Sequence, residues 1–446
     1  MVLPIKLFLN VPNQKIFCNT PWYELHIYHN GDLGICCQES QKLYDEDQQQ
    51  YNIANMTLME WFNGQLANDF RQQLLGDSKS KFCTRCYQEE SLGNNSRRLK
   101  SNQKSVIFTR SAFDQSWLQS PGLKHFEFSA NHQGKTATVP IDLHIDLGNF
   151  CNMTCKMCRA ANSSSIASQE VKWGITSSQQ YLGTDWTRNT DVWNRFKQEL
   201  LDLPGLNNIH FMGGETLLTD RLEDLVDWLT EHKRFDTCIS FVTNGSRFKS
   251  GLMEKLSKFR RVGIEVSIEN LGPRNDYIRQ GFSTDQILKN ILQYQSWCNG
   301  SSITVTLRPA PSLLSVGEFV HLLEYAVINK FVVKSNLVIK PKFLDIRILP
   351  DFVKQQYIPK YQAFLSQFDS DCADTDYNAS DPNNVRLIVK EQATQCLSAL
   401  QTPAPDDAEQ LLAQMVEHCK RWDVVYQTNA RLLYPELTEV WDKYGY

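Results

Sequence analysis

The second half of the chain alternates short apolar segments with longer stretches whose apolar residues recur at helical spacing. Short apolar runs bounded by turn residues are typical of buried strands, and longer amphipathic stretches are typical of helices. The expected strands are 141–147, 208–212, 237–243, 262–268, 303–307 and 336–339. The expected helices are 221–232, 252–259, 284–297 and 316–328, with a longer and less regular crossover after the first strand.

Strands that alternate with helices predict a parallel sheet, because parallel neighbours need a crossover connection. Right-handed crossovers can curl such a sheet toward a barrel whose active face lies at the carboxyl ends of the strands. The expected strands are fewer than the eight of a closed barrel. We therefore predict an α/β fold built on a partial (β/α)6 TIM-like barrel.

The segments before and after this region do not show the alternation of strands and helices. The N-terminal part contains a helical pattern over 58–75 that ends at Gly76, a residue type favoured at helix C-caps. After Pro350 the chain is helical and polar, and a proline-rich interruption at 401–407 precedes a last amphipathic stretch. We predict a separate, cysteine-rich N-terminal module over 1–128, a barrel over 129–345 and a helical C-terminal extension over 346–446.

Charge and hydropathy argue against two classes of partner. The 46 basic and 50 acidic residues give a net charge of −4 with no long run of either sign, so nothing indicates nucleic-acid binding. No apolar stretch approaches the roughly 20 residues that span a bilayer, and the apolar run at the N-terminus is too short for a signal peptide. We expect no membrane partner and a cytoplasmic location.

Thirteen cysteines suggest metal binding, because clustered thiols in a reducing compartment more often hold metal than pair as disulfides. Directly after the first expected strand, Cys151, Cys155 and Cys158 have a C-x3-C-x2-C spacing. Three thiolates on one tight loop can hold three corners of a 4Fe-4S cubane and leave one iron open to another molecule. A zinc loop and a set of core cysteines are the alternatives.

This loop, after the first strand of a partial barrel, resembles the signature of the radical S-adenosylmethionine (SAM) superfamily. The resemblance implies a 4Fe-4S cluster whose open iron binds SAM. It also implies reductive cleavage of SAM to methionine and a 5′-deoxyadenosyl radical, which takes a hydrogen atom from the substrate. In such enzymes the cofactor carries the difficult chemistry, and the protein binds, orients and excludes water. Met157 stands where family members often have an aromatic residue.

The same resemblance implies cofactor-binding residues at the ends of later strands. Gly213, Gly214 and Glu215 resemble a GGEP motif that contacts the ammonium group of SAM, although Thr216 replaces its proline. Candidates for holding the methionine carboxylate and the ribose hydroxyls are Thr243, Asn244, Ser267 and Glu269, with Arg279 as a further basic candidate. Each could instead be a helix cap, a turn residue or a surface arginine. No catalytic residue that acts on the substrate is evident.

The second cysteine group precedes the barrel. Cys18, Gly31 and Cys36 match the C-x9-15-G-x4-C spacing of twitch and SPASM auxiliary-cluster modules, and Cys83 with Cys86 would complete four ligands. Cys36 and its neighbour Cys37 are both candidates for the second ligand. The resemblance implies an auxiliary 4Fe-4S cluster, and a structural zinc site is the alternative.

The familiar modules of this kind follow the barrel, whereas this one precedes it. The chain resembles a subgroup of twitch-domain radical proteins with the same order, in the helix at 61–63, the Glu90–Gly93 step and the YPEL motif at 434–437. The resemblance therefore extends over nearly the whole chain.

We expect radical modification of a peptide or protein side chain, because auxiliary-cluster radical enzymes with related modules commonly act on ribosomal peptides. Modification of a small metabolite, such as a sugar or nucleotide derivative, is one alternative, and a non-catalytic metal-cluster scaffold is another. The expected partners are a peptide or small-molecule substrate and an electron donor such as flavodoxin or ferredoxin.

Overall fold

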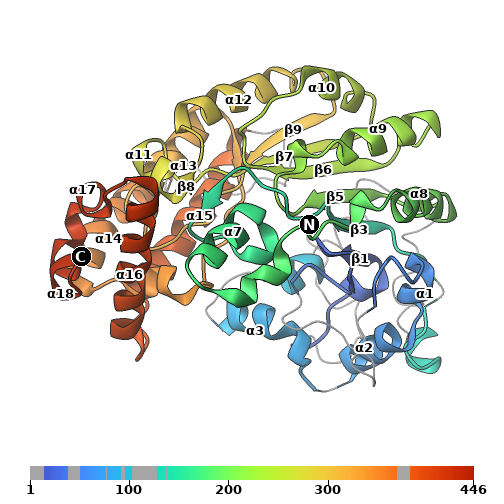
Figure 1. The fold of residues 1–446 in the computed structure, drawn as a ribbon, viewed down its shortest axis with the longest axis horizontal. Coiled ribbons are helices and arrows are strands. Elements are labelled where there is room, and N and C mark those ends of the chain that lie inside the picture. Colours follow the sequence, from blue (N-terminus) through green and yellow to red (C-terminus); the bar gives the residue numbers. More distant parts are fainter. Residues whose placement is uncertain are drawn as a thin grey trace. The chain divides into compact units, whose positions relative to one another are not determined.

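A computed structural model describes residues 15–38, 51–76, 78–91, 96–102, 128–136, 138–368 and 382–446 (Figure 1). Contacts divide the chain into two compact units. Unit 1 comprises Met1–Phe150 and Gly183–Ser240, and unit 2 comprises Cys151–Leu182 and Phe241–Tyr446. Gly93 of the Glu90–Gly93 step lies outside the described residues. The three-part division expected from the sequence remains a prediction.

Unit 1 contains four adjacent strands of the main sheet, in the order β5-β3-β1-β2. Its strands are β1 (Glu24–Ile27), β2 (Leu33–Gly34), β3 (Asp142–Asp146) and β5 (Asn208–Met212). Strand β3 is parallel to both β1 and β5, whereas β2 is antiparallel to β1. The N-terminal region therefore adds two strands to the sheet that contains the first expected strand.

The sheet of unit 1 has one apolar face and one polar face, because successive side chains of a strand point to opposite sides. The apolar face carries fully buried residues from three strands, namely Leu25, Ile27, Leu143, Ile145, Ile209 and Phe211. On the other face, the register aligns His26 with His144 and His144 with His210. Two residue pairs earlier, and so on the same face, it aligns Glu24 with Asp142. A buried polar row across parallel strands is costly unless its groups are paired or bind a ligand, so this face marks a candidate site.

The helical segments of unit 1 lie before, between and after these strands along the chain. They are η2 (Thr20–Trp22), α1 (Leu58–Phe62), α2 (Gln65–Leu75), η3 (Lys81–Cys83), α3 (Thr84–Ser91), η6 (Trp186–Arg188), α8 (Thr190–Glu199), η7 (Leu200–Asp202), η8 (Thr216–Leu218) and α9 (Arg221–Glu231). Helix α9 agrees with the expected helix at 221–232. The single helix expected over 58–75 is wrong, since α1 and α2 are separate.

The break between α1 and α2 has a local cause. Helix α1 begins with a capping box in which Thr57 and Glu60 bond each other's backbone N–H groups. Gly64 is extended, with φ −67° and ψ 163°, and acts as the N-cap of α2. A Cβ atom on Gly64 would lie 2.9 Å from the Glu60 carbonyl oxygen, so the turn needs a glycine there. Gly76 does cap the end of α2, where its N–H donates to the Gln73 carbonyl.

Unit 2 contains the parallel strands β7 (Val262–Val266), β9 (Ile303–Leu307) and β10 (Val332–Val333). Strand β6 (Cys238–Thr243) begins in unit 1 and ends in unit 2. A separate antiparallel pair joins β4 (Thr154–Cys155) to β8 (Arg279–Gln280).

The last expected strand, 336–339, is wrong, because β10 lies earlier, at Val332–Val333. The later segment donates N–H groups from Asn336 to the Pro309 carbonyl and from Val338 to the Pro311 carbonyl. Prolines have no N–H to donate in return, so this segment cannot complete a ladder. The β-branched pair at Val332 and Val333 instead pairs with β9.

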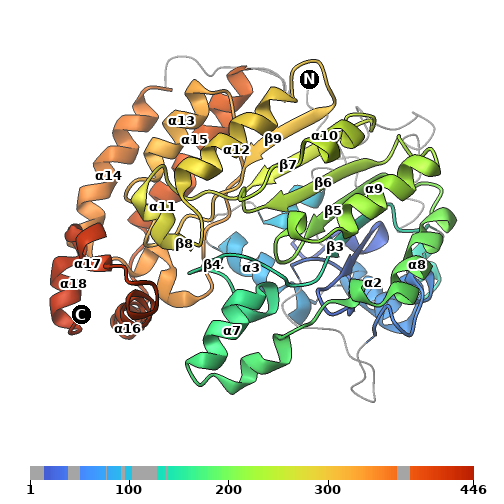
Figure 2. The same ribbon diagram turned by 45° about the horizontal axis from the view of Figure 1, so that its top comes forward.

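Helices of unit 2 follow its strands and form its C-terminal part (Figure 2). They are η4 (Ala160–Asn162), α7 (Ser164–Lys172), η5 (Thr176–Tyr181), α10 (Ser250–Leu256), α11 (Pro273–Ile278), α12 (Thr284–Ser296), α13 (Phe319–Ile328), η9 (Lys342–Leu344), η10 (Ile346–Ile348), α14 (Asp351–Ser366), α15 (Pro382–Gln401), α16 (Ala408–Tyr426), α17 (Ala430–Leu433), η11 (Pro435–Leu437) and α18 (Thr438–Lys443). Parallel strands with helices between them, and a helical C-terminal region, confirm the α/β class. Among the described residues, no helix combines the length and the apolar character needed to cross a bilayer.

The loop after β5 packs against the loop after β3 within unit 1. The Glu215 N–H donates to the Phe150 carbonyl at 2.8 Å, and Gly213 and Gly214 both have positive φ. A Cβ atom on Gly214 would lie 2.3 Å from the Phe150 carbonyl oxygen. Such an overlap with backbone can be relieved only if one of the two loops moves.

We expect Gly214→Ala to lower the thermal unfolding midpoint by several degrees, because both the left-handed backbone and the overlap with Phe150 oppose a side chain. Gly183→Ala is the matched control, since Gly183 also has positive φ but a Cβ atom there meets nothing within 4 Å. Differential scanning calorimetry of both variants checks the difference. Equal midpoints for the two variants would show that the close approach of the loops is not required.

Candidate metal centres

The loop of Cys151, Cys155 and Cys158 is held by backbone contacts within unit 2. Cys155 lies in β4 directly opposite Arg279 of β8, and the Cys158 N–H donates to the Cys155 carbonyl at 2.9 Å. At the start of the loop, the Cys151 N–H donates to the hydroxyl of Ser164, the first residue of helix α7. Helix α7 therefore fixes the start, and the β4–β8 pair the middle, of a loop of eight residues, 151–158.

The three thiols of this loop lie close enough to affect one another. Burial raises the pKa of Cys158 to about 12, and the neighbouring thiols of Cys155 and Cys151 add to the rise. Thiols that oppose one another's ionisation are suited to a metal, because bound iron or zinc stabilises the thiolate form.

Arg279 joins this loop to a buried carboxylate. Its guanidinium donates through Nε and Nη2 to Glu269 Oε1 at 2.9 and 2.6 Å, and through Nη1 to Cys155 Sγ at 3.6 Å. Glu269 is fully buried, and its other carboxylate oxygen accepts from the Ala310 N–H. The ion pair with Glu269 raises the pKa of Arg279, so the guanidinium remains charged beside the thiol. Glu269 thus holds the guanidinium of Arg279 in place. The expected binding of SAM by Glu269 remains a prediction.

Two asparagines connect the cysteine loop to the end of β6. Asn244 Nδ2 donates to Asn152 Oδ1 at 2.9 Å, and Asn152 Nδ2 donates to the Ser246 hydroxyl at 3.1 Å. Nearby, the Ser267 N–H donates to the Thr243 carbonyl at 2.9 Å. The structure therefore gathers these expected residues within unit 2, and adds Asn152 and Ser246, which the sequence motif did not single out.

Gly213, Gly214 and Glu215 belong to unit 1. Glu215 is buried, and its side chain accepts from the Leu217 N–H at 3.1 Å as the cap of η8. Through its backbone it bonds Phe150, the residue before Cys151 in the chain. Its expected contact with the SAM ammonium remains a prediction.

Lys156, inside the cysteine loop, is a residue that sequence reasoning missed. Its ammonium lies 3.7 Å from the ring centroid of Tyr277 and 4.4 Å from that of Trp422, and Lys156 is only 2% exposed. Burial lowers its pKa to about 7. Cation–π contacts in a desolvated site are worth about 2 kcal/mol, so Lys156 fastens the loop to helix α16.

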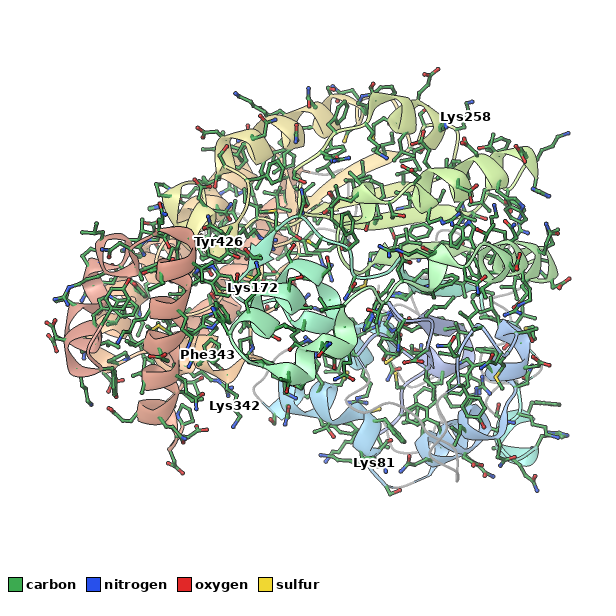
Figure 3. The ribbon with its side chains drawn as sticks, in the orientation of Figure 1. Lys81, Lys172, Lys258, Lys342, Phe343 and Tyr426 are labelled. Carbon is green, nitrogen blue, oxygen red and sulfur yellow. The ribbon has the colours of Figure 1, made fainter. Side chains whose placement is uncertain are left out.

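Trp422 also covers the residues that follow the loop. It packs with Ala160, Ile166 and Ala167, and Tyr426, labelled in Figure 3, lies partly buried at the same cluster. Lys156, between Cys155 and Cys158, lies 266 positions before Trp422 in the chain, so a local sequence pattern cannot predict their contact.

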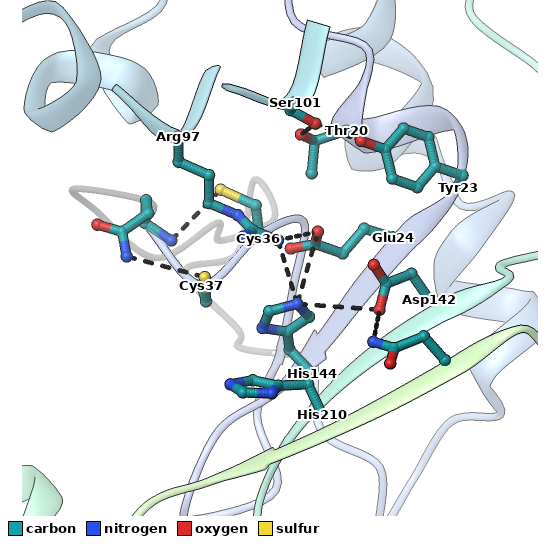
Figure 4. Close-up of polar contacts among 12 residues, drawn as sticks. Thr20, Tyr23, Glu24, Cys36, Cys37, Arg97, Ser101, Asp142, His144 and His210 are labelled. Atoms are coloured by element: carbon teal, nitrogen blue, oxygen red, sulfur yellow. Dashed lines mark hydrogen bonds and ion pairs between the residues drawn. The ribbon is translucent and has the colours of Figure 1, made fainter. Parts of the chain in front are cut away.

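The N-terminal cysteines meet at a cavity inside unit 1. Its lining includes all four members of one expected ligand set, namely Cys18, Cys36, Cys83 and Cys86. Cys37 is not part of this lining, and its sulfur lies near Glu24 and His144 instead (Figure 4). Of the two candidates for the second ligand, the cavity therefore favours Cys36.

Charge around the cavity suits a cluster of thiolates. Burial raises the pKa values of Cys18, Cys83 and Cys86, that of Cys86 to about 11, and thiols of the same set add to the rise at Cys83 and Cys86. Arg97 and Arg98 also line the cavity, and the positive charge of Arg98 opposes the rise at Cys18 and Cys83. Four converging thiols with two guanidinium groups beside them form a donor set that fits a 4Fe-4S cluster, and also tetrahedral zinc.

Two family models match the chain. The model described as "Radical SAM superfamily" matches residues 145–328, and the model described as "Iron-sulfur cluster-binding domain", named SPASM, matches residues 18–87. The first range contains Cys151, Cys155 and Cys158, and the second contains all five N-terminal cysteines. Both models imply 4Fe-4S clusters, as expected from the sequence. No match is found among curated proteins.

Solved structures resemble the chain more distantly. "Native anSMEcpe with bound AdoMet" has a TM-score of 0.37 and 16% identity over 51% of this chain and 63% of that chain. "Crystal structure of Streptococcus suis SuiB" has a TM-score of 0.36 and 14% identity over 68% of this chain and 63% of that chain. The match thus spans less than two thirds of either structure.

The family assignment therefore depends on the two sequence models and on the cysteine loops that they contain. The resemblance proposed from the C-x3-C-x2-C loop and from the N-terminal cysteine spacing is confirmed by these matches. This chain therefore contains a radical SAM region at residues 145–328, which belongs to a superfamily of enzymes, and a SPASM-type iron–sulfur cluster-binding region ahead of it at residues 18–87.

Proposed function

We propose that this protein cleaves SAM reductively and uses the resulting 5′-deoxyadenosyl radical to take a hydrogen atom from a peptide or protein side chain. The observation that carries the first part is the convergence of three cysteines on a loop anchored opposite Arg279. The peptide substrate rests on analogy with auxiliary-cluster radical enzymes. A flavodoxin or ferredoxin as electron donor, and a cytoplasmic location where thiols stay reduced, complete the proposal.

Cys151, Cys155 and Cys158 would hold the radical SAM cluster. When bound, that cluster supplies the electron for SAM cleavage and the open iron for SAM itself. Asn152 and Asn244 brace the loop from the end of β6, and Lys156 fastens its far side to α16. These residues hold the thiols in place and keep water away, which is the part of the chemistry left to the protein.

Arg279 is proposed as a positioning residue that also sets the charge at the cluster. Its guanidinium donates to Cys155 Sγ and is held there by the buried Glu269. Hydrogen bonds and positive charge at a cluster sulfur favour the reduced state, because reduction adds negative charge. The arrangement would therefore make a cluster bound to Cys155 easier to reduce.

The second centre is proposed to be an auxiliary 4Fe-4S cluster held by Cys18, Cys36, Cys83 and Cys86. With four protein ligands it has no open iron, so its proposed role is electron transfer. A substrate radical must lose an electron whenever an oxidised product forms. The auxiliary cluster would accept that electron.

We expect a variant with Cys151, Cys155 and Cys158 all changed to serine to form no 5′-deoxyadenosine above the level of the reagents. The loss follows because serine cannot replace thiolate as a cluster ligand. The measurement is chromatography of anaerobically reconstituted protein incubated with SAM and dithionite. Cys298→Ser, an isolated cysteine of the same unit, should retain wild-type formation. Formation by the triple variant at the wild-type rate would refute the proposed reaction.

Changing both Arg279 and Glu269 to glutamine should lower the reduction potential of the cluster. The double change avoids leaving a buried charge unpaired. The fall is expected to be about 60 mV for each 1.4 kcal/mol of interaction lost at Cys155. Electron paramagnetic resonance during a redox titration gives the potential.

The control for this experiment is the pair Arg308 and Glu265, 2.8 Å apart between β9 and β7, changed in the same way. Its loss should leave the potential within error of wild type. An unchanged potential in the Arg279 and Glu269 double variant would show that Arg279 does not influence the cluster.

Changing Cys83 and Cys86 to alanine should remove about four iron atoms per chain and leave SAM cleavage in place, because the two centres have separate ligands. Metal analysis of the anaerobically reconstituted protein, together with the 5′-deoxyadenosine assay, checks both parts. Loss of zinc with unchanged iron would show that these cysteines bind zinc and not an auxiliary cluster. Loss of SAM cleavage in correctly folded protein would contradict the separation of roles.

A further inference from the structure

We propose that Glu24, Cys37 and His144 form a binding site for a single divalent transition-metal ion, with zinc as the best match, next to the four-cysteine cavity. This site goes beyond the proposed radical chemistry and does not depend on it. It uses the cysteine that the cavity leaves out. The three residues lie in unit 1 on β1, just after β2, and on β3.

The ligand atoms of the three residues converge. One carboxylate oxygen of Glu24, Cys37 Sγ and one ring nitrogen of His144 all lie within 4.8 Å of one another. His144 Nε2 is 3.8 Å from Glu24 Oε2 and 3.9 Å from Asp142 Oδ1, so a fourth oxygen ligand is at hand (Figure 4). Ligands around a tetrahedral zinc lie roughly 3 to 4 Å apart, given bonds of about 2.0 to 2.3 Å. Small side-chain adjustments therefore suffice to close the site.

One carboxylate oxygen of Glu24 is buried without a hydrogen bond from the described residues. Glu24 is 2% exposed, and its Oε1 is a buried atom that accepts no hydrogen bond from any described residue. Its Oε2 accepts from Arg97. A bare carboxylate oxygen in the interior is costly, and a metal ion would remove that cost.

The protonation state of His144 is compatible with metal binding. Arg97 Nη2 lies 3.1 Å from His144 Nε2, and an arginine can only donate. His144 Nε2 therefore carries the lone pair, and a metal ion would bind that lone pair in place of the Arg97 N–H. Arg97 can keep its bond to Glu24 Oε2 while Oε1 binds the ion, which would orient the carboxylate.

The charges at the site also favour a cation. Glu24, Asp142 and Cys37 all lie near the guanidinium of Arg97, which also neighbours Cys36 of the four-cysteine cavity. With both carboxylates and the Cys37 thiol ionised, these three groups and Arg97 carry a net charge of about −2, which a divalent ion would neutralise.

The mixed donor set selects the class of metal. A thiolate excludes magnesium and calcium, which prefer oxygen ligands, and one sulfur cannot hold an iron–sulfur cubane. One sulfur, one nitrogen and one or two oxygens are donors that zinc accepts in tetrahedral sites. The consecutive cysteines Cys36 and Cys37 are thus divided between two metal centres.

The test compares Cys36→Ser with Cys37→Ser in the full chain, purified anaerobically, incubated with zinc sulfate and desalted. Inductively coupled plasma mass spectrometry then gives zinc and iron per chain. We expect about one zinc in wild type, loss of zinc with retained iron in Cys37→Ser, and loss of iron with retained zinc in Cys36→Ser. Glu24→Gln should weaken zinc binding at least about tenfold, which keeps the test valid if Cys37→Ser misfolds.

His210→Ala is the matched control, because the ring of His210 lies 4.9 Å from that of His144 in the same row but its Nδ1 bonds Ser240 instead. It should keep zinc. Zinc-edge X-ray absorption of wild type should show one sulfur among nitrogen and oxygen ligands. Wild type that keeps no zinc, zinc retained by both Cys37→Ser and Glu24→Gln, or iron lost from Cys37→Ser would each overturn the proposal.

Discussion

The antiparallel pairing of β4 with β8 is the contact on which the proposed chemistry depends. It sets Cys155 opposite Arg279, so that a buried guanidinium faces the Cys155 thiol. The guanidinium is itself fixed by Glu269, which is fully buried. A charge held in a low-dielectric interior acts more strongly than one in water. The two-residue strands therefore define both the position and the electrostatic surroundings of the cysteine loop.

In unit 1, strand pairing likewise determines where the functional side chains lie. Two strands from the N-terminal region extend the sheet, and the alternation of their side chains places apolar residues on one side and a row of histidines and carboxylates on the other. Cys36 and Cys37 come shortly after β2, which is hydrogen-bonded to β1 in this sheet. This accounts for a cluster-binding region that precedes the radical SAM region in the chain, since the strand β1 takes a place beside β3.

Sequence reasoning succeeded where the signal was local. Strands 208–212 and 303–307 and the helix near 221 have the bounds expected from periodicity, and the cysteine spacing led to the family. The division of helix 58–75 was missed because Gly64 reads as one tolerated glycine in a helical pattern. The last strand was misplaced because its partner, and the prolines that exclude the alternative, lie on other segments.

Contacts between distant residues could not be predicted. Lys156 and Trp422 meet only after folding, as do Arg279 and Cys155 or Glu24 and His144. The choice between Cys36 and Cys37 has the same character, because spacing allows both while the cavity includes one. For such pairs, tertiary structure supplies information that no motif carries.

The central claim is that three thiolates hold a cluster with one iron open to SAM. Mössbauer spectroscopy of protein reconstituted anaerobically with iron-57 tests it most directly, because SAM bound to one iron makes that iron distinct from its three neighbours. The account predicts a 4Fe-4S spectrum in which one iron site changes on addition of SAM, and no such change when the loop cysteines are replaced by serine. A spectrum without a 4Fe-4S cluster, or one that SAM leaves unaltered, would contradict it.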